Sequence, residues 1–206
     1  KAVELASKNN TKNQSEYNEI ENKSTHDNLW RAIDLLDFDD FQAEIIFKTL
    51  IKEYPFFIDA YNHLSIAFRN QNKKFESLLT AEKSYNIGKK IFPKEFNAKR
   101  DKIIWANLNN RPFLRACQIY GLELQDINNH SKAIEIFNEN LLLNEEDHQG
   151  IRYLKLQSLF TMKDFLEVKK ILNKYKDDWS IEFLYAKVNI EIINGNIKRA
   201  KENLKN

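Results

Sequence analysis

The residues most able to do chemistry are scattered along the sequence. The chain has four histidines and one cysteine, and no two histidines lie at the i, i+4 spacing with which a helix presents two ligands to one metal ion. Cys117 has no histidine near it in sequence, so no base is placed to activate its thiol. We therefore expect no catalytic residue, no metal ligand and no bound cofactor. Cys117 is interpreted as a small apolar group that faces a neighbouring helix.

An acidic run between Asp34 and Asp40 is the next candidate for a site. It lacks the glycine and the downstream glutamate of a calcium loop, and the sequence has no glycine-rich phosphate loop. Acidic side chains are favourable at the positive end of a helix dipole. We therefore interpret these acids as residues that start a helix.

A basic segment is the strongest candidate for contact with nucleic acid or with an acidic partner. Seven basic residues lie between Lys83 and Lys102, with Tyr85, Phe92 and Phe96 among them. Such interleaving is typical of nucleic-acid interfaces. Tyr85 and Phe92 also occupy predicted core positions, and a solvated lysine face explains the segment as well. Nucleic-acid association through this segment is kept as an alternative.

The elements that would position these residues are predicted to be helices. The 206 residues are 42% hydrophobic and include only four glycines and three prolines, whereas sheet proteins use more of both in their turns. The net charge of +2 disfavours nucleic acid and anionic membranes as partners, and no apolar run approaches the ~18 residues of a spanning helix. A single cysteine fits a reducing compartment, so we expect a cytoplasmic protein. Because the chain begins at Lys1 rather than at a methionine, removal of a leader peptide is kept as an alternative.

Small, aromatic and proline residues recur at fixed intervals. The two clearest sets are Ala43, Phe47, Leu50, Tyr54 and Pro55, and Ala81, Tyr85, Gly88, Phe92 and Pro93. A small residue lets two helix axes approach closely, and a proline ends a helix. The spacing therefore predicts antiparallel helix hairpins. In the second hairpin, about four extra residues near Gln71 to Phe75 are expected to lengthen the turn.

The repeats also predict the domain boundaries. Ala133, Val168 and Ala200 continue the series, but 52 residues separate Ala81 from Ala133, which predicts an insert that packs as an extension. The polar composition of residues 1–25 is typical of an arm, with one or two short helices as its expected structure. The expected divisions are an arm at 1–25 and a repeat domain at 26–206, with units at 26–56, 57–93, 111–145, 147–177 and 178–206 and the insert at 94–110.

The third hairpin resembles the tetratricopeptide repeat, a 34-residue helix-turn-helix unit with small residues at two fixed positions and an aromatic residue four positions after the second. Gly121, Ala133 and Phe137 match these positions, while Glu145 stands where the repeat has proline. The resemblance implies an all-α fold, a right-handed α-solenoid of antiparallel helix hairpins, whose concave groove is lined by the first helix of each unit.

Two segments have a narrower resemblance. Residues Asn110–Ala116 and Asn144–Leu154 are similar to a bacterial tetratricopeptide subgroup related to suppression-of-tumorigenicity proteins, although Glu145 replaces a proline and His148 an asparagine. This likeness implies a shared structural subfamily rather than an activity. Three arginines of these segments are expected to pair with nearby acids and lock adjacent helices: Arg111, Arg115 and Arg152.

The family's groove positions, carried over by alignment, give a surface of amide, aromatic and aliphatic side chains with two arginines. The predicted partner-binding residues are Asn62, Ile66, Arg69, Arg115, Gln118, Gln125, Tyr153, Gln157, Tyr185 and Asn189. Amides can bond a peptide backbone and tyrosine rings can cover its side chains, so the surface suits an extended peptide or a partner helix. The paired lysine and asparagine with which chaperone-binding members hold a terminal carboxylate are missing.

We therefore expect a non-catalytic scaffold for protein–protein interaction. One alternative is a regulatory or substrate-recruiting region of a larger enzyme or assembly. The other is the nucleic-acid-associated repeat that would use Lys83 to Lys102. The sequence does not identify the partner.

Overall fold

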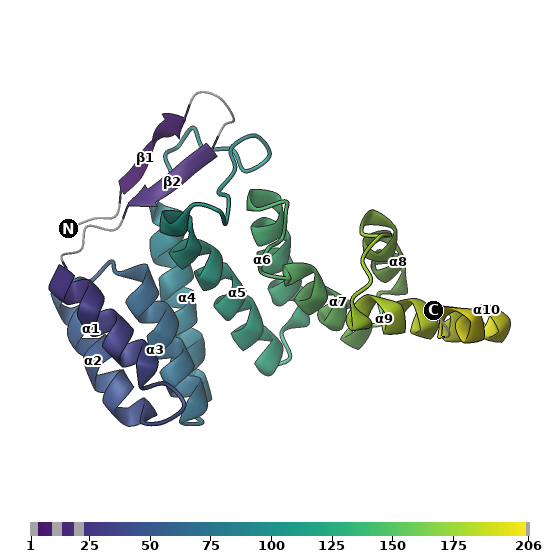
Figure 1. Cartoon of the computed structure of the whole chain (residues 1–206), viewed down its shortest axis with the longest axis horizontal. Coiled ribbons are helices and arrows are strands. Elements are labelled where there is room, and N and C mark those ends of the chain that lie inside the picture. The colour runs from purple at the N-terminus through teal and green to yellow at the C-terminus, as the bar shows by residue number, and fades with distance from the viewer. Residues whose placement is uncertain (1–3, 10–13, 19–22, 205–206) are drawn as a thin grey trace. The chain divides into compact units, whose positions relative to one another are not determined.

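The computed structural model describes residues 4–9, 14–18 and 23–204. In these ranges the chain is an all-α solenoid of antiparallel helix hairpins preceded by a short β-hairpin (Figure 1). The predicted fold class is confirmed. The paired helices are α1 (Lys23–Asp34) with α2 (Asp40–Glu53), α3 (Ile58–Asn70) with α4 (Lys74–Ile91), α5 (Arg111–Asp126) with α6 (His130–Leu143), α7 (Ile151–Thr161) with α8 (Phe165–Lys174), and α9 (Ile181–Ile193) with α10 (Ile197–Asn203).

The chain divides into two compact units, Lys1–His148 and Gln149–Asn206. The first contains the hairpins from α1 to α6, and the second contains those from α7 to α10. Among the residues that the structure describes, no helix combines the length and the apolar character needed to span a membrane.

The N-terminal arm differs from the expectation of short helices. Strands β1 (Glu4–Asn9) and β2 (Gln14–Asn18) form an antiparallel pair in which Leu5 lies opposite Tyr17. A segment with few apolar residues has little helix face to bury, and strand pairing satisfies the backbone groups of β1 and β2 directly.

Four of the hairpins turn in the same way. One turn residue takes a left-handed conformation, and the residue after it donates its N–H to a carbonyl five positions back, as Lys73 does to Phe68 at 2.9 Å. This is the Schellman ending of a helix, and the donor residue is also the N-cap of the next helix. The left-handed residues are Asn72, Asn128, Lys163 and Gly195, with φ of 64°, 61°, 58° and 78°.

Three of the second helices, α2, α6 and α8, begin with a side-chain cap. Asp39, Asn129 and Asp164 cap them by accepting an N–H three residues on, at 3.0, 3.3 and 3.1 Å. The interpretation of the acidic run as a helix start is thus confirmed for Asp39 and Asp40. Asp34 is instead the last residue of α1, and Asp37 lies in the turn. Four residues after each N-cap lies a buried residue whose N–H bonds the carbonyl of the N-cap residue: Ala43, Ser77, Ala133, Val168 and Ala200.

The second hairpin corrects the register expected from the sequence. Ser77, rather than Ala81, occupies the position of close approach, because its hydroxyl lies 3.0 Å from that of Ser65 on α3. The turn itself has the ordinary length, from Gln71 to Lys73. The extra residues instead extend α4 to 18 residues, against 14 in α6.

The extra turn of α4 carries Gly88 against the ring of Phe113. A Cβ atom at Gly88 would overlap that ring, and one at Gly121 would overlap the ring of Phe137. The close helix approach predicted at Gly121 is thus confirmed, and Ala133 is fully buried. Phe113 and Phe137 are both fully buried and lie at the centre of the first unit's core.

The insert packs as an extension, as expected. Ile103 is fully buried, and its N–H bonds the carbonyl of Leu143 at 2.9 Å. Nearby, the Trp105 N–H bonds Asn144 Oδ1 at 3.1 Å. The insert ends in the 3₁₀ helix η1 (Leu108–Asn110), which leads directly into α5.

Candidate binding cavities on the first helices

The second unit has a cavity of about 360 Å³ between its two first helices, α7 and α9. Four of the predicted partner-binding residues line it, Tyr153 and Gln157 from α7 and Tyr185 and Asn189 from α9. Phe160 adds a further ring to the wall. Tyr185 is 55% exposed, so its ring is available to a bound molecule.

The half-buried carboxylate of Asp178 holds Tyr153, which lines this cavity. Asp178 accepts a hydrogen bond from Tyr153 Oη at 3.1 Å and an ion-pair contact from Arg152 Nε at 2.6 Å. Burial alone would raise the pKa of Asp178, but hydrogen bonds from Ser180, Arg152 and Tyr153 lower it to about 2. The predicted pairing of Arg152 with an acid is confirmed. The Tyr153 ring, which also meets Phe183 edge to face at 5.7 Å, is therefore held in place.

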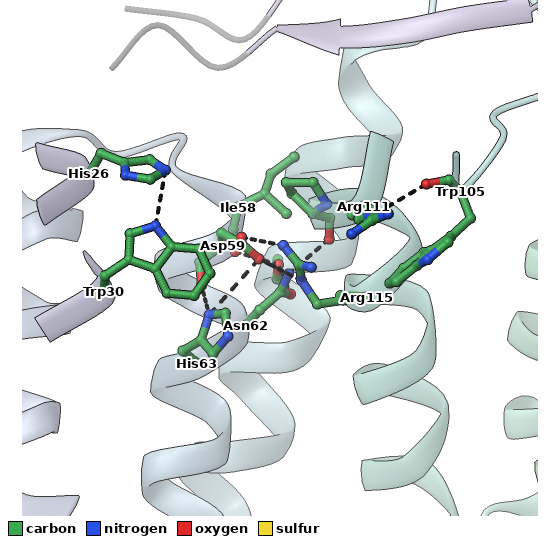
Figure 2. Close-up of polar contacts among 11 residues, drawn as sticks. His26, Trp30, Ile58, Asp59, Asn62, His63, Trp105, Arg111 and Arg115 are labelled. Atoms are coloured by element: carbon green, nitrogen blue, oxygen red, sulfur yellow. Dashed lines mark hydrogen bonds and ion pairs between the residues drawn. The ribbon is translucent and has the colours of Figure 1, made fainter. Parts of the chain in front are cut away.

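The first unit has a larger cavity, of about 480 Å³, over α1, α3 and the start of α5. Figure 2 shows its polar centre, where Arg115 of α5 reaches Asp59 of α3. The N-terminal side is formed by Trp30 and His26 of α1, whose side chains bond each other at 3.1 Å. Trp30 is 52% exposed, so it offers an apolar face to the cavity.

Asp59 is the hub of this polar centre. Its Oδ1 accepts from Arg115 Nε at 3.0 Å and from Asn62 Nδ2 at 3.1 Å, and Arg115 Nη2 bonds Oδ2. Burial alone would raise the pKa of Asp59, but interactions with His63 and Arg115 and the hydrogen bond from Asn62 lower it below its usual value. The predicted pairing of Arg115 with an acid is therefore confirmed.

Arg111 also lines the cavity, and among the described residues it is not paired with an acid. Its Nε bonds the carbonyl of Trp105 at 3.1 Å, and its guanidinium lies 4.8 Å from the centre of the Trp105 ring. Within the part of the chain that the structure describes, the expected ion pair at Arg111 is therefore not formed. The insert supplies an aromatic ring and a carbonyl in place of a carboxylate.

Other predicted groove residues of the first unit lie elsewhere. Asn62 is fully buried, because its amide donates to the Pro112 carbonyl at 2.8 Å and accepts from Ser84 Oγ at 2.7 Å. The first turn of α5 covers it, so its assignment to the groove is corrected. Arg69 is held by the buried Glu123, with Nε to Oε1 at 2.6 Å. Three predicted residues are half-buried and do not line the cavity: Ile66, Gln118 and Gln125.

Trp30 and Arg111 line the first cavity but are missing from the sequence-based groove set. Helix α1 matched the repeat poorly because Arg31 stood where a small residue was expected, so no groove position was carried over to it. The structure has the fully buried Ala32 one position later. Alignment on Ala32 would have carried groove positions over to His26, Leu29 and Ile33, which line the same cavity, but not to Trp30.

The remaining candidates for chemistry have structural roles. Cys117 is buried, and burial raises the pKa of its thiol well above its usual value, so it stays protonated. Across the residues that the structure describes, no three His, Cys, Asp or Glu side chains are grouped to hold a metal ion. His63 packs against the ring of Phe47 at 5.9 Å.

The basic segment is partly neutralised. Lys89 pairs with Glu139, Arg100 with Asp101 and Lys102 with Glu145. Its interleaved aromatic residues pack on one another or on the core, with Phe92 stacked 4.1 Å from Phe96 and Tyr85 bonded to Glu139. Rings held in this way are not free to stack on bases.

The sequence matches no protein-family model and no curated protein. Solved structures share its fold. MamA from Desulfovibrio magneticus RS-1 has a TM-score of 0.63 at 12% identity, covering 89% of this chain and 93% of that one. A tetratricopeptide repeat protein from Parabacteroides merdae has a TM-score of 0.64 at 16% identity, covering 89% and 65%. The tetratricopeptide-like repeats of a kinesin light chain from Podospora anserina have a TM-score of 0.64 at 11% identity, covering 88% and 92%.

At these identities the likeness shows the fold, which is that of stacked tetratricopeptide hairpins. The narrower resemblance to the subgroup related to suppression-of-tumorigenicity proteins stays a prediction.

Proposed function

We propose that this protein is a non-catalytic scaffold that binds a peptide or a partner helix along the first helices of its hairpins. The observation that carries the proposal is the cavity between α7 and α9. It gathers Tyr153, Gln157, Tyr185 and Asn189, which are four of the residues expected to contact a partner.

The chemistry of this cavity suits a polypeptide. Gln157 and Asn189 carry side-chain amides that can both donate to and accept from a peptide backbone. Tyr185 and Phe160 offer flat rings that can cover apolar side chains with little loss of side-chain freedom. The volume of about 360 Å³ accommodates one or two side chains of the bound segment.

A selection from a random peptide library tests the proposal. The full chain is immobilised, enriched peptides are synthesised, and their dissociation constants are measured by fluorescence polarisation. We expect Tyr185→Ala to weaken these peptides about tenfold, because the exposed ring is removed without loss of core packing. Phe38→Ala is the matched control, since Phe38 is 89% exposed and lies in the turn between α1 and α2.

Two results would contradict the proposal. The selection could yield no enriched sequence, or the enriched peptides could bind Phe38→Ala and Tyr185→Ala with equal losses. Circular dichroism of each variant must match that of the parent protein, so that a loss of binding is assigned to the ring.

A further inference from the structure

The cavity of the first unit has an excess of positive charge. Both oxygens of Asp59 are engaged, by Arg115 and by Asn62. The Arg111 Nε bonds the Trp105 carbonyl, and the two terminal nitrogens of Arg111 have no hydrogen-bond partner in the described ranges. Two guanidinium groups therefore line the cavity with one carboxylate between them, and donors remain for an anionic ligand.

These guanidinium groups are held before any ligand arrives. Arg115 is anchored on Asp59 through two nitrogens, and the Arg111 guanidinium lies over the Trp105 ring. A planar guanidinium fits a planar carboxylate through two parallel hydrogen bonds. Because the side chains are already ordered, little conformational entropy is lost on binding.

One part of the cavity wall is apolar, although His26, His63 and Asn109 also line the cavity. Trp30 and Ile33 from α1 line it together with Leu108 from η1. Trp30 is 52% exposed and Leu108 67% exposed, so burying them would release water from apolar surface. A small anion alone would leave these apolar side chains exposed to water. A peptide can contact both the arginines and the apolar side chains.

The geometry points to a subsite in this cavity for an internal acidic residue of a peptide, adjacent to a large apolar residue of the same peptide. The acidic carboxylate bonds Arg111 and the free edge of Arg115, and the apolar side chain covers Trp30 and Leu108. This inference rests on the proposed function, because it assigns a partner chemistry to one of the two first-helix cavities.

The three tryptophans provide the test. In the ¹⁵N-labelled full chain, the indole N–H signals of Trp30 and Trp105 report on this cavity, while Trp179 of the second unit serves as an internal control. The probes are acetyl-Leu-Glu-Phe-amide and acetyl-Leu-Gln-Phe-amide, whose blocked ends carry no terminal charge. Sodium acetate and inorganic phosphate are titrated separately.

We expect the glutamate peptide to shift the Trp30 and Trp105 signals and to bind about tenfold more tightly than the glutamine peptide. Arg111→Gln should remove that preference, and Arg111→Lys should keep part of it, because lysine retains the charge but loses the planar fork. Arg31→Gln removes the same charge from an exposed position of α1 that does not line the cavity. It should leave binding unchanged.

Three outcomes would overturn the inference. The two peptides could bind equally, acetate or phosphate could bind as tightly as the glutamate peptide, or Arg31→Gln could weaken binding as much as Arg111→Gln. Failure here is distinguishable from failure of the proposed function. If Tyr185→Ala weakens binding of the selected peptides and Arg111→Gln does not, the scaffold proposal is supported and the acidic-residue subsite is contradicted.

Discussion

At the scale of single residues, the buried charges of the first unit join neighbouring helices. Asp59 and Glu123 each accept an arginine from the adjacent first helix, Arg115 and Arg69 respectively. Glu123 is 2% exposed. A carboxylate at such a depth is tolerated only when it is paired and hydrogen-bonded. These arginines therefore hold α3 to α5 before they can contact any partner.

Loss of one member of such a pair should be costly. We expect Arg69→Met to lower the free energy of unfolding by about 3 kcal/mol, because Glu123 would be left buried without its cation. The double variant Arg69→Met with Glu123→Leu should recover most of the loss. Urea unfolding of the three proteins measures both effects. Equal stability of Arg69→Met and the parent protein would show that Glu123 does not need its partner.

The lowered pKa of Glu44 predicts that the protein becomes less stable at acidic pH. Burial alone would raise the pKa of Glu44, but hydrogen bonds from Lys48, Lys73 and Gln71 lower it from 4.5 to about 2. Because the folded pKa is depressed, this contribution to stability is present in full above pH 4.5 and is lost as the pH falls towards 2.

Thermal unfolding between pH 6 and pH 2.5 checks this expectation. The parent protein should lose more stability over that range than Glu44→Gln, which has no carboxylate to protonate at this position. At pH 6 the variant should be less stable by about 2 kcal/mol. Parallel pH profiles for the two proteins would mean that Glu44 has the same pKa in the folded and unfolded chains.

At the scale of elements, each hairpin depends on how closely its helices approach. Gly121 on α5 leaves room for the Phe137 ring of α6. We expect Gly121→Leu to lower the free energy of unfolding by roughly 1–3 kcal/mol through overpacking. Scanning calorimetry of Gly121→Ala, Phe137→Leu and their combination separates the clash from other effects. The double variant should lose less unfolding free energy than the two single variants lose together. If the two losses simply add, the assigned contact between Gly121 and Phe137 is contradicted.

The hairpins could be predicted from the sequence, but their register only in part. Ser77 and Ala81 are both small and lie four residues apart on one face of α4, so the spacing alone could not tell which of them faces Ser65. The distinction comes from the turn, where Asn72 is left-handed and Lys73 begins the next helix. A rule that counted four residues from the N-cap would have selected Ser77.

The two cavities also differ in how far they could be predicted from the sequence. The one between α7 and α9 follows the repeat, and its residues Tyr153 and Tyr185 were predicted. The one in the first unit depends on Trp105 and Arg111, which the insert brings together. Helical periodicity contains no information about an irregular segment, so this cavity could not be placed from the sequence.

At the scale of the whole molecule, the division into two units predicts regional stability. Stacked repeats interact mainly with their neighbours, so a defect should loosen its own unit first. Val168→Ala leaves a void at a fully buried position of the second unit. Hydrogen exchange of the full chain should quicken in α7 to α10 more than in α3 to α5, and Phe47→Ala in the first unit should give the reverse pattern. If hydrogen exchange became faster to the same extent in both units of each variant, the two units would unfold as a single cooperative unit.

The left-handed turns have a consequence for heat resistance. Asparagine and glycine adopt this conformation readily, and they occupy three of the four equivalent turns, whereas Lys163 takes it at φ 58°. The β-carbon of Lys163 is under torsional strain that Gly195 avoids and that the asparagines tolerate better. We expect Lys163→Gly to raise the melting temperature, by an increment corresponding to about 1 kcal/mol, and a lower melting temperature in calorimetry would refute this. The loop between α7 and α8 is thus a position at which a single substitution would increase thermostability.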